Sequence, residues 1–363
     1  MSKSLDKLWY TRCGVPTSFG VAMHHDWIRE RLAIAGTRIE SLKASPDPVV
    51  RASHFDHSLP NSVRYGGASP AIWARSTGRE TRLIGLATTP AAQAIAVAPD
   101  STLQSVADLK GCRFGLPRWH NQPIDFIRAT ALRYLENVLR PHGLGLEDVE
   151  LVDYPVGARF ADEAVHTIPG TQTFGSRRLA GRSGELLGLI RGEVDAVFLH
   201  GAGALALSET LQLPRLTDEA SGADPVSWAH NDNPLLLTVD AHLLDEHLDT
   251  AVLLVGEILR AEQWGRAHPL DLRQIAAQEV NVSEYWIWKT YGDEGLQLST
   301  DLAGPSLGAV QDFADFLLLH GFLREQVDVS AWVDPRPLQL AHARLAAQPE
   351  SSTHIVSGYR HVQ

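Results

Sequence analysis

Short apolar runs alternate with segments of helical spacing along the first two thirds of the chain. This order is typical of an α/β fold with mainly parallel sheets. Near the N-terminus the spacing predicts a helix over residues 17–35, which Gly36 ends with a left-handed cap. Strands are predicted at residues 37–42, 82–87 and 94–98.

The same alternation continues before the chain becomes helical. A short helix over residues 106–110 and a glycine turn lead into a new strand. Helical leucines at residues 185–191 precede another strand, which ends at Leu199. From about residue 235 onward the pattern predicts helices. The clearest helical segments of this part are residues 251–268 and 310–320.

Length and composition describe a globular protein with more than one lobe. The 363 residues suffice for two lobes of ordinary domain size. With 44% hydrophobic and 21% charged residues, the composition is that of a soluble protein. The 32 basic and 43 acidic residues give a net charge of −11, which argues against nucleic acid or an anionic membrane surface as partner. We expect a monomer whose partner is a small molecule.

The cysteines and the N-terminus bear on the compartment. Cys13 and Cys112 are the only cysteines, which is too few for a disulfide framework and favours a reducing environment. Neither belongs to a cysteine pair of the kind that binds a metal. Residues 1–7 lack the apolar core of a secretory signal, and no later segment approaches a membrane span. We therefore expect a cytoplasmic protein.

Cys13 is a candidate nucleophile because of its position. It lies where a short apolar segment ends and a helix is about to begin. A thiol there can face a ligand, and nearby helix N-terminal amides favour its thiolate form. The alternative is a small buried hydrophobic side chain, which is the usual role of a lone cysteine. Arg12 either adds positive potential beside the thiol or points away along the alternating strand.

Three segments resemble the type II periplasmic-binding-protein fold, particularly its sulfonate, taurine and nitrate-binding branch. These segments are residues 107–111, 192–196 and 331–335. The resemblance implies two α/β lobes with a ligand cleft between them, and C-terminal helices packed on the first lobe. Fold alone does not determine function.

The same resemblance implies where the chain passes between the lobes. The expected crossings lie near residues 98–100 and 229–231. The expected first lobe comprises residues 1–100 and 232–363, and the expected second lobe comprises residues 101–231.

Three further motifs resemble the catalytic set of the hydroxybiphenyl sulfinate desulfinases. Cys13 is followed by Gly-Val-Pro, His54 by Phe, and Arg64 by Tyr-Gly-Gly. In that family the equivalent cysteine, histidine and arginine surround the sulfinate. The resemblance therefore implies a cofactor-independent reaction with these three catalytic residues. His57 and Leu59 depart from the family, which has a tyrosine and a glutamine there, so the substrate can differ.

The chemistry of these residues agrees with that role. Arg64 offers a planar charged fork that suits the two oxygens of a sulfinate, and His54 can orient the thiol. Gly66 and Gly67 allow the backbone to approach a ligand closely. Ser69 and Pro70 have the chemistry of an N-cap and a first helical position, so a helix would direct free amides at the same anion.

A metal site is not expected. His57, His24, His25 and Asp26 are suitable ligand types, but they form no closed metal signature. Adjacent residues of a helix also face apart, which separates the ligands of the segment 24–26.

The second wall of the binding site should come from the other lobe. Ligands of open α/β sheets lie at the carboxyl ends of strands. Two predicted strands end in residues of suitable chemistry, which we expect to bind substrate: Trp119, His120, Phe126, His200 and Gly201. The aromatic members could equally be core packing.

Three functions remain open on the sequence. The first is a desulfinase that cleaves the C–S bond of an aromatic or related organic sulfinate and releases sulfite, with Cys13 as nucleophile or as proton donor. The second is a non-catalytic binding protein that captures a sulfonate, sulfinate or carboxylate for a transporter. The third is an enzyme with the same cysteine that acts on another bond, such as a decarboxylase.

Overall fold

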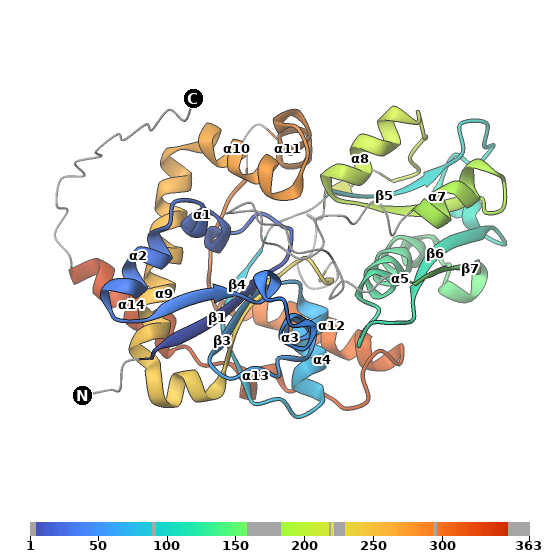
Figure 1. Ribbon diagram of the computed structural model, residues 1–363. Coiled ribbons are helices and arrows are strands. Elements are labelled where there is room, and N and C mark those ends of the chain that lie inside the picture. Colours follow the sequence, from blue (N-terminus) through green and yellow to red (C-terminus); the bar gives the residue numbers. More distant parts are fainter. Residues whose placement is uncertain are drawn as a thin grey trace.

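The strands of the computed structural model form two sheets of five strands each within the part of the chain that it describes (Figure 1). Figure 1 shows the first sheet beside the long C-terminal helix α9 and the second sheet on the other side of the molecule, with α5, α7 and α8. The structure describes the following residues: 5–88, 92–157, 183–217, 219–220, 229–292 and 296–347.

The first sheet carries the N-terminal strands. Its order is β2-β1-β3-β10-β4. β1 pairs in parallel with β2 and β3, whereas β10 is antiparallel to β3 and β4. The strands of this sheet are β1 (Lys7–Arg12), β2 (Arg38–Ser41), β3 (Ser62–Gly66), β4 (Thr81–Ala87) and β10 (Leu235–Asp240).

The second sheet has the same mixed character. Its order is β7-β6-β8-β5-β9, with β6 parallel to β7 and β8, and β5 antiparallel to β8 and β9. In each sheet one strand, β10 in the first and β5 in the second, runs opposite to the other four. The expectation of mainly parallel sheets therefore holds for the strand directions, but the antiparallel strand in each sheet was not predicted. The strands are β5 (Ala92–Val97), β6 (Arg113–Trp119), β7 (Glu150–Val156), β8 (Ala196–His200) and β9 (Glu219–Ala220).

The position of β5 also corrects the first expected crossing. The predicted boundary at residue 100 places this strand in the first lobe, but it pairs with β8 in the second sheet. The chain therefore leaves the first sheet between β4 and β5, before the strand rather than after it. A fully buried strand has the same apolar pattern in either sheet, so the sequence could not assign it. The other lobe boundaries stay a prediction.

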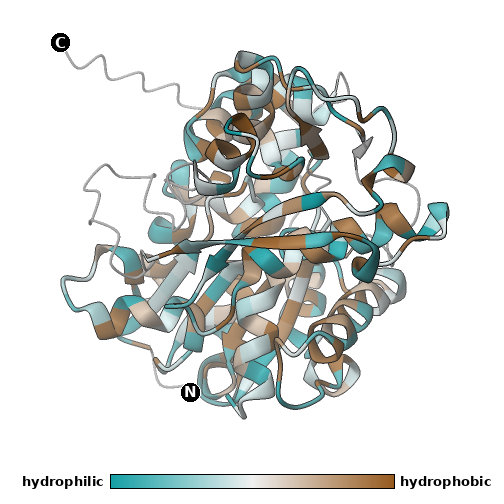
Figure 2. Ribbon diagram, turned by 90° about the vertical axis from the view of Figure 1, so that its right-hand side faces the viewer, coloured by the Kyte–Doolittle hydropathy of each residue, from teal (hydrophilic) through white to brown (hydrophobic). Residues whose placement is uncertain are grey.

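Helices cover both sheets. In Figure 2 they carry brown and teal residues on the same helix, as expected of helices with one buried and one solvated side. The helices are α1 (Ser18–His24), α2 (Trp27–Ile34), α3 (Pro48–Asp56), α4 (Ala68–Ser76), α5 (Phe126–Leu139), α7 (Ser183–Ile190), α8 (Gly201–Thr210), α9 (Ala241–Ala267), α10 (Pro269–Val280), α11 (Glu284–Tyr291), α12 (Gly304–Leu319), α13 (Val329–Trp332) and α14 (Arg336–Ala347). The 3-10 turns are Leu42–Ala44, Val106–Leu109, Arg140–His142 and Leu146–Asp148.

Two predicted helical segments differ from the structure. The expected helix over residues 17–35 is broken into α1 and α2, because Asp26 has the left-handed backbone angle φ of 58°. The start of the expected helical region after residue 235 is strand β10, buried at five of its six positions. A short run of apolar residues does not distinguish a buried strand from a helix by periodicity.

One apolar cluster joins the two sheets. Leu236 of β10 and Phe114 of β6 belong to the same cluster of buried residues. Helix α12 reinforces this connection, because Asp312 pairs with Arg133 of α5 and His320 lies 3.1 Å from Glu136 of α5. Besides the two crossings, these contacts between α12 and α5 therefore connect the lobes.

A buried carboxyl group lies behind the first sheet. Glu262 of α9 is 5% exposed, and burial raises its pKa to about 7, against hydrogen bonds from Thr300 and Ser18 that lower it. Thr300 Oγ1 also lies 3.0 Å from the hydroxyl of Tyr65, which belongs to β3, the strand that carries Arg64. The folded state therefore favours the neutral form of this carboxyl group.

We predict that Glu262→Gln changes how stability depends on pH. A carboxyl group whose folded pKa is raised stabilises the fold below its unfolded pKa, and this contribution is lost as the pH rises toward about 7. Urea unfolding should show Glu262→Gln gaining about 1–3 kcal/mol over wild type at pH 8 but little at pH 4.5. The exposed Glu325 offers a control, Glu325→Gln, which removes the same charge. Parallel pH profiles for wild type and Glu262→Gln would contradict the prediction.

Candidate active site

Two neighbouring parallel strands bring Cys13 and Arg64 together. In the register of β1 with β3, Thr11 lies opposite Arg64 and Arg12 opposite Tyr65. Cys13 follows β1 directly, and its backbone N–H donates to Tyr65 O over 3.3 Å. Because parallel strands end at the same edge of a sheet, the thiol meets the glycines that follow β3.

The sulfur of Cys13 is surrounded by nitrogen atoms. Gly67 N lies 3.4 Å from Sγ, Arg64 Nη2 lies 3.6 Å from it, and His54 Nε2 lies 3.8 Å from it. The amide and the guanidinium can only donate, so both stabilise negative charge on the sulfur. The structure thus brings together all three residues predicted as catalytic.

Close packing requires glycine at position 66, the last residue of β3, and at position 67. A Cβ atom on Gly66 would lie 2.4 Å from Cys13 Sγ, and one on Gly67 would lie 2.4 Å from Asn231 Nδ2. Any larger residue at position 66 must displace the thiol. The atoms packed against these glycines are the thiol and Asn231, and the predicted close approach to a ligand stays a prediction.

Arg64 is a buried cation. Its side chain is held by carbonyl groups, with Nε donating to His54 O over 3.2 Å and Nη1 to Gly67 O over 2.7 Å. Among the described residues no carboxylate forms an ion pair with it, and the residue is 1% exposed. Burial lowers the pKa of Arg64, and negative charge on Cys13 and Asp232 opposes that shift. An anion bound beside Arg64 would offset the free-energy cost of burying its guanidinium.

His54 is oriented by the strand that carries the thiol. It lies near the end of α3, and its Nδ1 is 2.7 Å from Thr11 Oγ1. Thr11 and Cys13 are two residues apart and therefore face the same side of β1. Thr11 was not predicted as a site residue, although this alternation could have indicated it.

The amides that open α4 do not match the expectation. The helix begins at Ala68 with Gly67 as its N-cap, two positions before the predicted cap at Ser69. Ala68 N donates to Asn231 O over 2.5 Å, and Ser69 N donates to Asn231 Oδ1 over 3.0 Å. These amides are therefore not free for an anion, because a residue 162 positions further along occupies them.

The two predicted aromatic residues of the second lobe lie in an interface between the lobes. Trp119 and Phe126 belong to one apolar cluster with Leu42 and Phe55. The rings of Phe126 and Phe55 are stacked with centroids 6.5 Å apart, and Phe55 follows His54. Both side chains are thus packed in the core beside the helix that carries His54. Their contact with a substrate stays a prediction.

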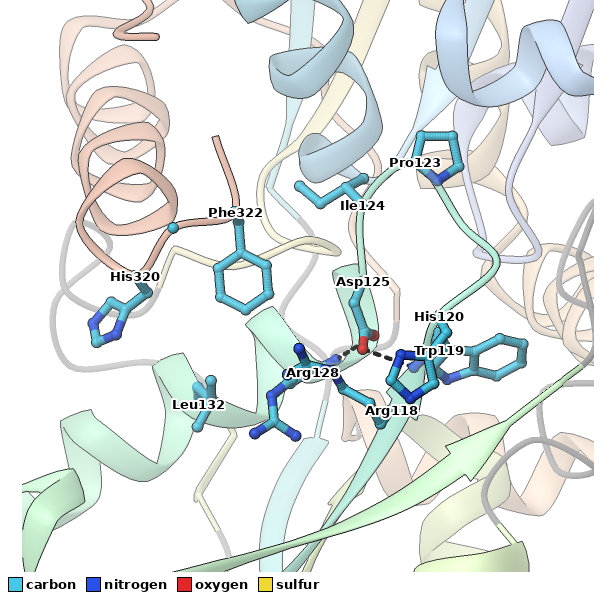
Figure 3. Close-up of a pocket in the computed structure, with 11 residues that line it drawn as sticks. Arg118, Trp119, His120, Pro123, Ile124, Asp125, Arg128, Leu132, His320 and Phe322 are labelled. Atoms are coloured by element: carbon cyan, nitrogen blue, oxygen red, sulfur yellow. Dashed lines mark hydrogen bonds between the residues drawn. The ribbon is translucent and has the colours of Figure 1, made fainter. Parts of the chain in front are cut away.

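A pocket of about 460 Å³ lies on the outer side of Trp119 (Figure 3). It contains the exposed His120 and is closed on the far side by Phe322 and His320. Asp125 accepts hydrogen bonds from Trp119 N at 2.8 Å and Arg128 N at 3.2 Å. Burial raises the pKa of Asp125 to about 6. His120 therefore faces this pocket, whose lining includes neither Cys13 nor His54.

His200 and Gly201 lie at the end of β8, next to the segment that returns the chain to the first sheet. His200 Nδ1 is 3.5 Å from Asp232 Oδ2, and its ring lies edge-on to His230. Gly201 begins α8 with φ of 76°, a backbone angle that favours glycine. His200 is thus linked to the Cys13 site through residues 230–232, whereas contact of either residue with substrate stays a prediction.

Two other polar side chains complete the surroundings. Arg12 points to the opposite face of the strand and pairs with the buried Glu279, so it does not line the thiol. His57 ends α3 in the left-handed conformation. Burial and the charge of Arg64 lower the pKa of His57 to about 3, which keeps it neutral.

The described residues hold no group of three histidine, cysteine, aspartate or glutamate side chains placed to bind a metal ion. In the same part of the chain, no helix has both the length and the apolar character needed to cross a membrane.

Comparisons with known proteins agree with the geometry. No family model matches the chain. It is 26% identical to the 2'-hydroxybiphenyl-2-sulfinate desulfinase of Rhodococcus erythropolis over 365 residues, which cover 91% of this chain and 92% of that protein. The suspected resemblance to this enzyme is confirmed.

Solved structures confirm the fold. The crystal structure of the desulfurization enzyme DSZB matches with a TM-score of 0.72 at 24% identity, covering 94% of this chain and 99% of that one. The periplasmic aliphatic sulphonate binding protein SsuA from Escherichia coli matches with a TM-score of 0.65 at 15% identity, covering 91% and 92%. The two-lobed periplasmic-binding-protein-like fold predicted from the sequence is therefore correct.

We predict that Gly66→Ala impairs the thiol without unfolding the protein. The added methyl group would lie 2.4 Å from Sγ and push it away from its donors. Alkylation of Cys13 by iodoacetamide at pH 7 should slow about tenfold or more, because the thiolate loses stabilising contacts. Gly256→Ala, in α9 with open space around it, is the matched control. Equal alkylation rates for the two variants would contradict the assignment.

Proposed function

We propose that this protein is a cofactor-independent desulfinase that cleaves the C–S bond of an aromatic or related organic sulfinate and releases sulfite. The observation that carries the proposal is the buried Arg64 beside the Cys13 sulfur, without a carboxylate partner among the described residues. The likeness to 2'-hydroxybiphenyl-2-sulfinate desulfinase supports an aromatic substrate. Cys13, His54 and Arg64 are the proposed catalytic residues.

The sulfinate binds by its two oxygens in this proposal. Arg64 presents its Nη2 toward the sulfur of Cys13 at 3.6 Å, and Gly67 N points to the same place. A guanidinium and an amide together offer two donors to one oxyanion, and burial strengthens both interactions. The sulfinate sulfur is thereby held close to the thiol, and its charge compensates that of Arg64.

Two routes lead from this complex to sulfite. In the first, the Cys13 thiolate attacks the sulfinate sulfur, and the departing carbon keeps the electron pair of the C–S bond and takes a proton. Water then cleaves the cysteine-bound sulfur group, which leaves as sulfite and returns the thiol. The donors around Sγ support this route because they stabilise the thiolate.

In the second route Cys13 is the proton donor. Its thiol protonates the carbon that bears the sulfinate, the C–S bond breaks, and sulfur dioxide leaves and reacts with water to give sulfite. His54 Nε2, at 3.8 Å from Sγ, returns a proton to the thiolate in this case. Both routes need the same three residues.

We predict that the protein releases sulfite from aryl sulfinates and that Cys13→Ser abolishes this release. The hydroxyl group is neither a comparable nucleophile nor a comparable acid. Arg64→Lys keeps the charge but loses the fork, so it should lower kcat/KM about 10- to 100-fold. A panel of aryl and alkyl sulfinates with a sulfite assay measures both effects. Cys112→Ser is the matched cysteine control and should retain full activity.

A non-catalytic binding protein is the second candidate, because the fold also matches the sulphonate-binding protein SsuA. Tight binding of sulfinates by wild type, with no sulfite released from any of them, would establish it in place of the enzyme. The same outcome would exclude Cys13 as a reacting group.

The route itself can be tested by mass. If Cys13 acts as nucleophile, rapid quenching during turnover should trap a protein species heavier by one sulfur dioxide unit, and Cys13→Ser should not form it. Intact-mass spectrometry measures the species. Its absence at several quench times, with steady sulfite release, would favour the proton-donor route instead.

The remaining expectations belong to the same proposal. The enzyme acts as a monomer in the cytoplasm on a small anionic substrate. The carbon skeleton of that substrate need not be hydroxybiphenyl, since a neutral His57 stands where the resembling enzymes have a tyrosine.

A further inference from the structure

We infer that Asn231 is a positioning residue for the Cys13 thiol, acting from the segment that returns the chain to the first sheet. As a role in catalysis this rests on the proposed function, whereas the effect on the thiol does not. Asn231 does not contact the sulfur itself. It packs against Gly67, whose backbone N–H contacts the sulfur.

Asn231 grips the start of α4 with both its backbone and its side chain. Its carbonyl oxygen accepts from Ala68 N at 2.5 Å, and its Oδ1 accepts from Ser69 N at 3.0 Å. Its side chain also packs on Gly67 so closely that a Cβ there would lie 2.4 Å from Nδ2. Together these contacts fix the backbone on the C-terminal side of Gly67.

The position of Gly67 determines two of the contacts to the thiol. Its N–H donates to Cys13 Sγ at 3.4 Å, and its carbonyl oxygen receives Arg64 Nη1 at 2.7 Å. The other amino group of Arg64 reaches Sγ at 3.6 Å. The Gly67 carbonyl and the Ala68 N–H belong to one peptide group, so a rotation of that group would release the guanidinium, and a displacement of Gly67 would weaken its amide contact to the sulfur.

Asn231 is itself held by buried neighbours. Its Nδ2 donates to Asp232 Oδ1 at 2.6 Å, and Asp232 Oδ2 lies 3.5 Å from His200 Nδ1 in the second lobe. The backbone N–H of Asp232 donates to His230 Nδ1 at 3.1 Å, so this nitrogen carries no hydrogen. His230 Nε2 lies 2.5 Å from the side-chain amide nitrogen of Gln93, on β5.

These contacts connect the second lobe to the thiol. The connection runs from His200 through Asp232 and Asn231 to Gly67, and then to Cys13. Asn231, Asp232 and His200 are each at least nine-tenths buried, so water does not compete for these hydrogen bonds. A purely structural cap would stabilise α4 alone, whereas this one also sets the donors to the sulfur.

The test uses variants that break and then rebuild the pair. Asn231→Ala removes both side-chain contacts. Asn231→Asp keeps the acceptor for Ser69 N but places a carboxylate against Asp232. The double variant Asn231→Asp with Asp232→Asn exchanges the two groups and can restore every hydrogen bond at unchanged net charge. All variants carry Cys112→Ser, so that iodoacetamide reports on Cys13 only.

We expect Asn231→Ala and Asn231→Asp to slow alkylation of Cys13 at pH 7 about three- to tenfold, and the exchanged pair to restore it. At pH 10 thiols are ionised in most surroundings, so the rates should converge there. Asp328→Ala is the control, because Asp328 caps α13 through Ala331 N at 3.1 Å in an exposed position. It should lower Tm without changing alkylation.

Two results would overturn the inference. One is a rate of Cys13 alkylation equal to that of wild type in both single variants. The other is a folded exchanged pair whose alkylation rate stays as low as that of Asn231→Asp. Should Asn231→Ala fail to fold, the comparison of Asn231→Asp with the exchanged pair decides alone. Sulfite release separates the two proposals: if wild type releases none while alkylation follows the expected order, the desulfinase assignment fails and the positioning role stands.

Discussion

The guanidinium of Arg64 is the constraint on which the site depends. A cation that is 1% exposed loses its hydration, and here carbonyl oxygens of His54 and Gly67 replace only part of it. No carboxylate among the described residues forms an ion pair with it, so the remaining compensation comes from the charge of Asp232 nearby and from negative charge on Cys13 or on a bound anion. The same buried charge therefore favours negative charge on the sulfur and on any anion bound beside it.

The fold around this charge is similar to that of a ligand-binding protein. The two-lobed fold is similar to a sulphonate-binding protein and to a desulfurization enzyme, so the architecture does not separate the two activities. What the chain adds is a thiol at the end of β1, at the edge where the lobes meet. The interlobe cluster of Phe55 with Trp119 and Phe126 braces α3, the helix that carries His54.

Much of the fold was predictable because local patterns carry it. The strands at residues 82–87 and 94–98 correspond to β4 and β5, and the longest predicted helix lies within α9. The two strands that were wrongly assigned share one cause. Buried strands β5 and β10 are apolar on both faces, so their sheet, direction and even their type are decided by distant partners.

The sequence by itself determined the chemistry at Cys13, His54 and Arg64, because side-chain type and motif are local properties. It also determined that Gly66 and Gly67 have no side chain. Only the tertiary structure decided that a Cβ at Gly66 would meet the thiol and that Asn231 would occupy the amides of Ala68 and Ser69. Ser69 and Asn231 are 162 positions apart, and their contact forms only when the crossing segment packs against the first sheet.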